Sequence, residues 1–153
     1  LIQKEFSRIM GLKDGTKKMS KSDLSDLSRI NLTDDRDLII NKIKKAKTDP
    51  LPLPNSLNEL DARPEAKNLL GIYSSLINCT LEQSINEFSG KNFSEFKEKL
   101  SQVLVEKIDK ISSEIKKLNT DKKYIDKILL DGQKKANDIS SYKLKKMHEI
   151  IGF

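Results

Sequence analysis

The sequence predicts an all-α fold, an antiparallel helical bundle, on the basis of three observations. Apolar residues recur at spacings of three and four through several long segments. A content of 36% hydrophobic and 34% charged residues fits helices that each have one buried and one solvated face. The two longest helical segments are separated only by Asn119 and Thr120, and such a short connection implies that these two helices run antiparallel.

The first helix is predicted over residues 35–47. Apolar residues recur from Ile39 to Ala46 at spacings of four and three, and lysines concentrate at the end of the segment, where they favour the helix dipole. Thr33 or Asp34 is available as the N-cap residue.

Residues 48–62 are predicted to be an extended linker, because alternate prolines fix φ and remove amide donors. A docking motif for a proline-reading domain is the alternative to a plain linker. A helix over residues 64–77 then begins with a proline, which suits the first helical turn. Thr80 and Gln83 have capping-box spacing and open a short helix that ends before Gly90.

The longest periodic pattern covers residues 92–151 and predicts a long helical hairpin. Its first half carries an apolar stripe that begins after Asn92 and reaches Leu118 without a break. The stripe of the second half changes phase near Ser140 and Ser141, which predicts a bend or break there.

The chain contains one cysteine, Cys79, and one histidine, His148. A single cysteine forms no internal disulfide, so we expect Cys79 to be a small core residue in a reducing compartment. Nucleophilic and metal chemistry both need partners that these residues lack, so we expect a structural role for His148 and no protein metal site. No apolar run approaches the roughly 20 residues that cross a bilayer, and no membrane residence is expected.

The pentapeptide Lys-Met-Ser-Lys-Ser at positions 18–22 carries the chemistry of this sequence. Two lysines three positions apart, with small hydroxyl residues beside them, can direct ammonium, hydroxyl and backbone N–H groups at one polyphosphate. Such a loop can stabilise the charge that develops on a leaving pyrophosphate. The alternatives are a solvated basic loop and a localisation patch, which any lysine-rich pentamer can mimic. A Walker-type phosphate loop does not fit, because Gly11 and Gly15 lack the required Gly-Lys-Ser/Thr ending.

This pentapeptide resembles the second signature of class I aminoacyl-tRNA synthetases, the KMSKS loop. The flanking residues 8–17, and the segments 33–35, 42–49 and 68–73 in that order, are similar to the tryptophanyl-tRNA synthetase family. The tyrosyl enzymes normally have Phe-Gly in the middle of the pentapeptide, where this chain has Met-Ser. The ordered series of segments makes the resemblance more specific than the pentapeptide alone.

The resemblance runs from about residue 8 to the end of the chain and implies a carboxy-terminal fragment. Residues 1–23 would be the end of a truncated Rossmann-type nucleotide-binding domain with its KMSKS loop. Residues 24–153 would be a helical domain, in which the hairpin 92–151 resembles the anticodon-binding region. The family's first signature, with two histidines, and the acidic residue that reads the indole N–H are not found in this chain.

The implied activity is that of a tryptophan–tRNA ligase, which activates L-tryptophan with ATP to tryptophanyl-adenylate and transfers it to tRNA(Trp). The fragment alone is expected to be inactive. The resemblance further implies Mg²⁺ held by the ATP phosphates, a homodimeric parent protein, and the bacterial cytoplasm, with an organelle matrix as the alternative location. The rival reading is a stand-alone helical RNA-binding or adaptor module without catalysis.

The family pattern also assigns roles to individual residues of the loop. Arg8 to Leu12 would be the last strand of the missing parallel sheet, with no ladder to join in the fragment. Gly11 and Gly15 would permit backbone angles that other residues resist and the hinge motion of a lid, and the loop is expected to be disordered or misplaced in the fragment. The assigned site residues are Lys18 and Lys21 as catalytic groups on the pyrophosphate, Ser20 and Ser22 on phosphate oxygens, and Ile9 and Met19 beside the adenine.

The net charge of +6 is uneven along the chain. From Lys91 onward, 15 lysines stand against 10 acidic residues, and this excess favours an anionic partner, which for a synthetase would be tRNA. Simple solvation of lysine-rich helix faces is the alternative. The candidate phosphate contacts surround the interhelical turn and are Lys116, Lys117, Lys122 and Lys123.

Overall fold

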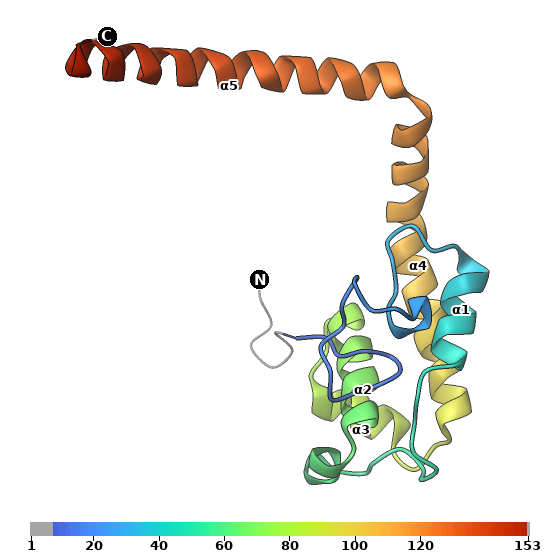
Figure 1. Cartoon of the computed structure of the whole chain (residues 1–153). Coiled ribbons are helices and arrows are strands. Elements are labelled where there is room, and N and C mark those ends of the chain that lie inside the picture. The colour runs from blue at the N-terminus through green and yellow to red at the C-terminus, as the bar shows by residue number, and fades with distance from the viewer. Residues whose placement is uncertain (1–7, 153) are drawn as a thin grey trace. The chain divides into compact units, whose positions relative to one another are not determined.

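The computed structural model describes residues 8–152, and this part of the chain is built from helices without a strand (Figure 1). The all-α prediction is therefore confirmed. The first seven residues of the predicted 1–23 segment lie outside the described residues. In chain order the elements are η2 (Asp26–Ser28), α1 (Arg36–Lys44), η3 (Asn58–Ala62), α2 (Pro64–Ile77), α3 (Leu81–Phe88), α4 (Phe93–Thr120) and α5 (Lys122–Ile151).

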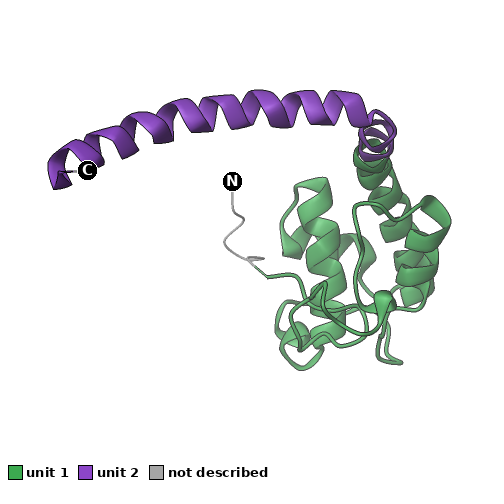
Figure 2. Ribbon diagram, turned by 45° about the horizontal axis from the view of Figure 1, so that its top comes forward, with its two compact units in different colours: residues 1–112 green, residues 113–153 purple. Residues whose placement is uncertain are grey.

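The chain divides into two compact units, residues 1–112 and 113–153, which are described separately (Figure 2). The first unit contains the packed core. At its centre, Tyr73 of α2, Phe88 of α3 and Phe96 of α4 meet edge to face, with ring centroids 4.9 to 5.8 Å apart. Edge-to-face aromatic pairs add to the stabilisation that their buried area provides, so three helices are joined at this point.

The predicted α2 and α3 helices are confirmed. Helix α2 begins with Pro64 and ends at Ile77, and its C-cap residue Asn78 adopts the left-handed conformation with φ of 59°. A capping box opens α3, because the Gln83 N–H donates to the Thr80 hydroxyl at 3.2 Å and the Thr80 N–H donates to the Gln83 side chain at 2.9 Å. Cys79 lies in the connection between these helices and is only partly buried, so the prediction of a core cysteine is wrong.

Helix α1 is shorter than predicted and has a different cap. Its N-cap is Asp35, whose carboxylate accepts from the Leu38 N–H at 2.9 Å, and neither Thr33 nor Asp34 has this role. Asp34 is instead paired with Lys42, as described below. The predicted apolar face is buried, and its residues are Ile39, Ile43 and Ala46.

The carboxyl end of α1 is closed by a lysine from α4. The Lys97 ammonium donates to the carbonyls of Ala46 at 2.7 Å and Lys44 at 3.3 Å. A cation at this position favours the negative end of the helix dipole. Burial, and then the nearby charge of Lys13, lower the pKa of Lys97.

The predicted linker 48–62 is extended as far as η3, but it is fastened to the first unit rather than loose. The Leu53 N–H donates to the Lys91 carbonyl at 2.9 Å, and the Leu53 side chain is buried. Arg63 holds the start of the linker through two hydrogen bonds to Asp49, at 2.7 and 2.9 Å. Burial raises the pKa of Asp49, but the bonds from Arg63 and from the Leu51 N–H outweigh this effect, so the net pKa is lowered.

The two long helices differ in burial along their length. The stripe of α4 is buried as far as Ser112, whereas none of residues 113–152 is buried. Helix α5 continues through Ser140 and Ser141, so of the predicted bend or break the break is wrong and the bend stays a prediction. A phase slip in an apolar stripe interrupts a helix only if the stripe must stay packed, and this helix buries none of its residues. The packing of residues 92–151 as an antiparallel hairpin stays a prediction.

Candidate functional site

The pentapeptide is approached by a narrow antiparallel turn. The Gly11 N–H donates to the Lys17 carbonyl at 2.8 Å, the Met19 N–H donates to the Ile9 carbonyl at 3.0 Å, and an isolated bridge joins Met10 to Lys18. Within residues 8–152 this pairing is an isolated bridge and not a sheet ladder, so residues 17–19 give residues 8–12 a local partner in place of a sheet. The pairing also brings Ile9 and Met19 side by side, and these are the two residues assigned to the adenine.

The entry to the turn is held by one side chain of α2. The amide of Asn68 accepts from the Met10 N–H at 2.9 Å and donates to the Met10 carbonyl at 2.9 Å, which imitates the pairing of a neighbouring strand. The Leu12 N–H donates to the Ser28 carbonyl at 2.8 Å and completes the attachment. Sequence reasoning included Asn68 only in a family segment and missed this role, because a side-chain clamp on a distant backbone leaves no periodic pattern.

The turn also lies directly against the start of α2. A Cβ atom built on Gly15 would lie 2.7 Å from the backbone nitrogen of Glu65 and 2.7 Å from the carbonyl carbon of Pro64. Real Cβ atoms do not approach backbone so closely, so this position requires glycine. The predicted reason, an unusual backbone angle, is wrong, since the described glycines with positive φ are Gly90 and Gly152.

The charged side chains of the turn are paired locally. The carboxylate of Asp14 accepts from the Thr16 hydroxyl at 2.6 Å and from the Thr16 N–H at 3.0 Å, and these bonds lower the pKa of Asp14 to about 2. Lys17 lies 3.3 Å from the same carboxylate. Lys17 therefore balances Asp14, whereas the lysines at 18 and 21 belong to the pentapeptide.

The pentapeptide itself faces solvent. Lys18, Ser20, Lys21 and Ser22 are exposed, while Met19 is partly buried and packs against the core. The two serine hydroxyls lie 2.9 Å apart, and the Ser22 N–H donates to the Ser20 hydroxyl at 3.3 Å. The loop thus presents two lysines and two neighbouring hydroxyls to solvent, and these are groups that can bind a polyphosphate.

The exit from the loop is braced by a group of charges that sequence reasoning missed. Arg29 donates to the Asp23 carbonyl at 2.9 Å and pairs with Asp26 at 2.9 Å. The Lys42 ammonium of α1, which is fully buried, lies 2.6 Å from the carboxylates of both Asp26 and Asp34. Hydrogen bonds from Lys42 and then from Asn31 lower the pKa of Asp26.

The carboxylates near the loop are engaged in these structural contacts. Asp34 pairs with Lys42, Asp35 caps α1, and Asp23 accepts from the Ser25 N–H at 2.8 Å. Among residues 8–152, no group of three or more histidine, cysteine, aspartate or glutamate side chains could hold a metal ion. In the same residues, no helix combines the length and the apolar character that crossing a membrane requires.

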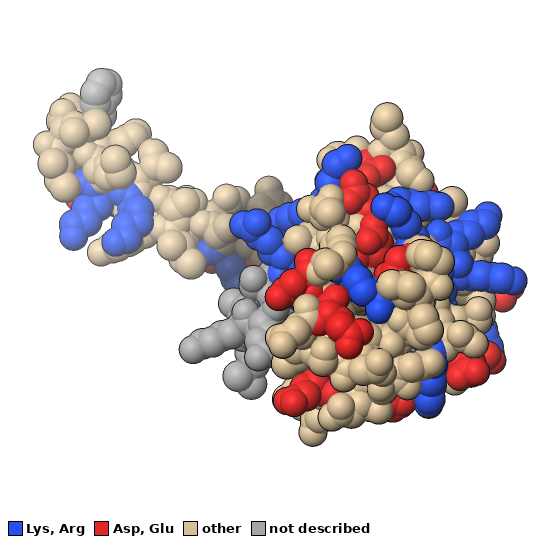
Figure 3. All heavy atoms as spheres, turned by 90° about the horizontal axis from the view of Figure 1, so that it is seen from below, with Lys and Arg blue, Asp and Glu red and all other residues tan. Residues whose placement is uncertain are grey.

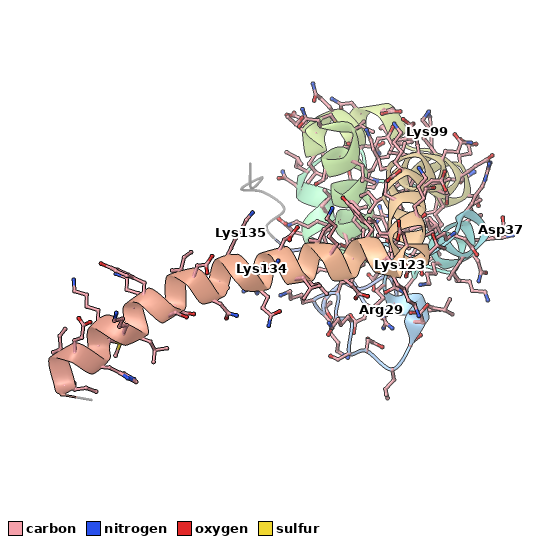
Figure 4. All side chains as sticks on the ribbon, turned by 90° about the horizontal axis from the view of Figure 1, so that it is seen from above. Arg29, Asp37, Lys99, Lys123, Lys134 and Lys135 are labelled. Carbon is pink, nitrogen blue, oxygen red and sulfur yellow. The ribbon has the colours of Figure 1, made fainter. Side chains whose placement is uncertain are left out.

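The four lysines proposed for RNA contact all lie in the second unit and are exposed. Lys116 and Lys117 are in the last turns of α4, and Lys122 and Lys123 are the first residues of α5. Figure 4 labels Lys123. Lys117 pairs with Glu114 at 2.6 Å, and both side chains are largely exposed. In contrast, acidic and basic side chains are mixed on the face of the first unit that Figure 3 shows.

Comparison with known proteins gives a consistent result. The pattern of the family described as tRNA synthetases class I (W and Y) matches residues 2–111. The tryptophan–tRNA ligase of Mesorhizobium japonicum is 49% identical over 95% of this chain, and that of Brucella melitensis is 47% identical over the whole chain. The Rickettsia felis protein of the same name is 46% identical, also over the whole chain.

The chain spans less than half the length of these relatives, namely 41% of the first, 43% of the second and 46% of the third. A solved structure of tryptophanyl-tRNA synthetase from Mycoplasma pneumoniae matches with a TM-score of 0.70 and 25% identity. That match covers 99% of this chain and 47% of the solved chain.

Proposed function

Because this chain belongs to the class I tRNA synthetases of the tryptophan and tyrosine family, we propose that it is the carboxy-terminal part of a tryptophan–tRNA ligase. The named relatives support tryptophan over tyrosine, and so does the Met-Ser pair inside the pentapeptide. The observation that carries the proposal is the exposed 18–22 loop, held at both ends by the helical unit.

In the proposed reaction, a carboxylate oxygen of tryptophan attacks the α-phosphorus of ATP. The bond from that phosphorus to the bridging oxygen breaks, and the electron pair leaves with pyrophosphate. Lys18 and Lys21 stabilise the charge that develops on the leaving group, while Ser20 and Ser22 donate hydrogen bonds to phosphate oxygens. Ile9 and Met19 contact the adenine. In a second step the ribose hydroxyl at the end of tRNA(Trp) takes the tryptophanyl group from AMP.

Tryptophan-dependent exchange of pyrophosphate into ATP, measured with the full-length protein, tests this assignment. Lys21→Ala should reduce the exchange rate by about 10²- to 10³-fold, since one lost charge-stabilising donor typically costs that much. Tryptophan binding should change little, because the indole does not contact the loop. Lys17→Ala is the matched control, as this lysine is paired with Asp14. Equal losses of exchange and of tryptophan binding in Lys21→Ala would contradict the assignment.

The proposed function divides the active site between this chain and the rest of the enzyme. Residues 8–152 show the loop, whereas the indole pocket and the two-histidine signature are expected elsewhere in the parent protein. The isolated chain should therefore not charge tRNA when it is mixed with tryptophan and ATP. Robust aminoacylation by the isolated chain would contradict this division, and so would a parent protein without such a pocket. The latter result would favour the stand-alone RNA-binding or adaptor module.

The proposed partners follow from the same assignment. Mg²⁺ would arrive with ATP and be held by phosphates, because the carboxylates near the loop already have protein partners. The parent enzyme would be a homodimer in the bacterial cytoplasm. For tRNA(Trp), the proposed contacts are the four lysines at 116, 117, 122 and 123. A quadruple alanine variant should bind tRNA with a shallower salt dependence, and an unchanged slope would exclude this cluster.

A further inference from the structure

Arg29 connects the exit of the loop to the helical unit through four contacts. Its guanidinium donates to the carbonyls of Asp23 at 2.9 Å and Ser25 at 3.5 Å. It also pairs with the Asp26 carboxylate at 2.9 Å and donates to the Asn31 side chain at 3.2 Å. The Arg29 side chain (Figure 4) is only 17% exposed, although residues 21–26, which precede it, are exposed. One planar group thus fixes several backbone and side-chain acceptors at once.

Asp26, the carboxylate that pairs with Arg29, also pairs with the buried Lys42 of α1. Lys42 has no exposed side-chain surface, and its ammonium lies 2.6 Å from Asp26 and 2.6 Å from Asp34. Asp34 is also buried and accepts from the Asn31 N–H at 2.9 Å. The charges of two cations and two carboxylates therefore balance, and Lys42 attaches this group to α1. A buried charge without its partner is strongly unfavourable, so this arrangement resists rearrangement.

The brace ends one residue after the loop. Asp23, whose carbonyl accepts from Arg29, directly follows Ser22. On the other side, Asn68 holds Met10, which is bridged to Lys18. The loop with its two lysines is therefore attached at both ends. Asn68 of α2 holds its entry, and Arg29, through Asp26 and Lys42 of α1, holds its exit. Lys21 lies two residues before the Asp23 attachment.

We infer that Arg29 is a positioning residue for the phosphate-binding loop, which it serves by fixing the Asp23 carbonyl to the Asp26–Lys42–Asp34 group. This inference rests on the proposed function. Without the brace, the entry of the loop stays attached while its exit is released, so Lys21 samples positions away from the leaving pyrophosphate. Displacement of a catalytic group by about 1 Å can cost on the order of 100-fold in rate. The expected decrease is therefore in kcat/KM for ATP, and not in the binding of tryptophan.

The chain offers a matched control in Arg63. This arginine has a similarly buried side chain, 11% exposed, and makes two bonds to Asp49 and two to the carbonyls of Leu51 and Pro52. It fastens the linker before α2, and these acceptors all lie outside the loop. Removing either arginine thus breaks a comparable set of bonds, but removing Arg29 alone releases the exit of the loop.

The experiment measures pyrophosphate exchange and thermal unfolding of the full-length protein with Arg29→Gln, Arg29→Lys and Arg63→Gln. Arg29→Gln should lower kcat/KM for ATP by about 10- to 100-fold, with the KM for tryptophan within about twofold of the unsubstituted value. Arg29→Lys keeps a charge for Asp26 but not the planar fork, so it should fold normally and still show most of the loss for ATP. Arg63→Gln should lower the unfolding temperature but leave kcat/KM for ATP unchanged.

Two results would overturn the inference while leaving the proposed function intact. One is unchanged pyrophosphate exchange in both Arg29 variants. The other is a decrease in kcat/KM for ATP in Arg63→Gln that equals the decrease in Arg29→Gln. If Arg29→Gln does not fold, the comparison of Arg29→Lys with Arg63→Gln decides the question. Absence of tryptophan-dependent exchange in the unsubstituted protein would instead overturn the proposed function, and the inference with it.

Discussion

Residues 8–112 and residues 113–152 are built from the same kind of sequence and differ in what their helices bury. Both regions carry apolar residues at spacings of three and four. In the first region this pattern coincides with a core that extends to Ile108. In the second region none of the described residues is buried, and most large apolar side chains of α5 are at least half exposed. Periodicity thus predicts a helix, but it does not show what covers the helix.

The two regions also use their charges differently. In the first region, cations are paired with carboxylates that join separate elements, as in Lys42 with Asp34 and Arg63 with Asp49. Residues 113–153 contain ten lysines against six acidic residues, so they carry +4 of the net charge of +6. Lys117 pairs with Glu114 within a single helix turn. The charges of the first region fix the structure, whereas the second region carries the positive excess on which the proposed tRNA contact depends.

Truncation of a core aromatic should show the largest difference between the regions. Phe96 is fully buried among Tyr73 and Phe88, so Phe96→Ala should lower the free energy of unfolding by about 3 to 5 kcal/mol. Leu129→Ala on α5, where the side chain is 64% exposed, should change it by less than about 0.5 kcal/mol. Urea unfolding followed by circular dichroism measures both. Similar losses would mean that α5 is packed in solution.

A methyl group added at Gly15 should have the next largest effect. The new Cβ would meet the backbone of Pro64 and Glu65 at 2.7 Å, and backbone cannot move aside as a flexible side chain can. Gly15→Ala should therefore destabilise the first region by about 1 to 3 kcal/mol, as overpacking does. It should also push the turn away from α2 and weaken ATP binding. The free energy of unfolding is measured by urea titration. If it is unchanged, the turn at Gly15 lies farther from the start of α2 in solution than in this structure.

The same substitution in the second region should have the opposite sign. Gly132 lies inside α5 with no atom within 4 Å of its added Cβ, so an alanine there meets nothing. Alanine has the higher helix propensity by about 0.8 to 1.0 kcal/mol, so Gly132→Ala should increase the helicity of α5. Circular dichroism at 222 nm during heating should show this gain. A loss of helicity would mean that another molecule or segment occupies this surface in solution.

Much of the fold could be predicted from the sequence because its determinants are local. The start of α2 at Pro64 and the capping box at Thr80 depend on residues within one turn, and both predictions are confirmed. The wrong cap of α1 has a different cause. Asp34 and Asp35 are both good N-caps in isolation, and the choice between them depends on Lys42, whose burial is a tertiary property.

The candidate site was found from the sequence only in part. The pentapeptide is a contiguous motif and could be recognised, but the groups that hold it come from α1 and α2 and are distant in sequence. Asn68 bonds to a residue 58 positions away. Arg29 stands close to the loop, yet its role depends on an aspartate that a lysine of α1 supports. Such attachments become visible only when the chain is folded.

The smallest effect should come from acid, and it tests whether the paired charges of the first region contribute to stability. Lys42 and Asn31 lower the pKa of Asp26 below its ordinary value of 3.8, so this contribution is present above that pH and is lost as the pH falls through the folded-state pKa. Asp26→Asn removes the titrating group, so its free energy of unfolding should fall less steeply below pH 3.8 than that of the unsubstituted chain. Glu114→Gln, which breaks an exposed pair in the second region, should change the free energy of unfolding at neutral pH by less than about 1 kcal/mol. Identical acid profiles for Asp26→Asn and the unsubstituted chain, measured by urea unfolding at a series of pH values, would mean that the Arg29 brace contributes nothing in solution.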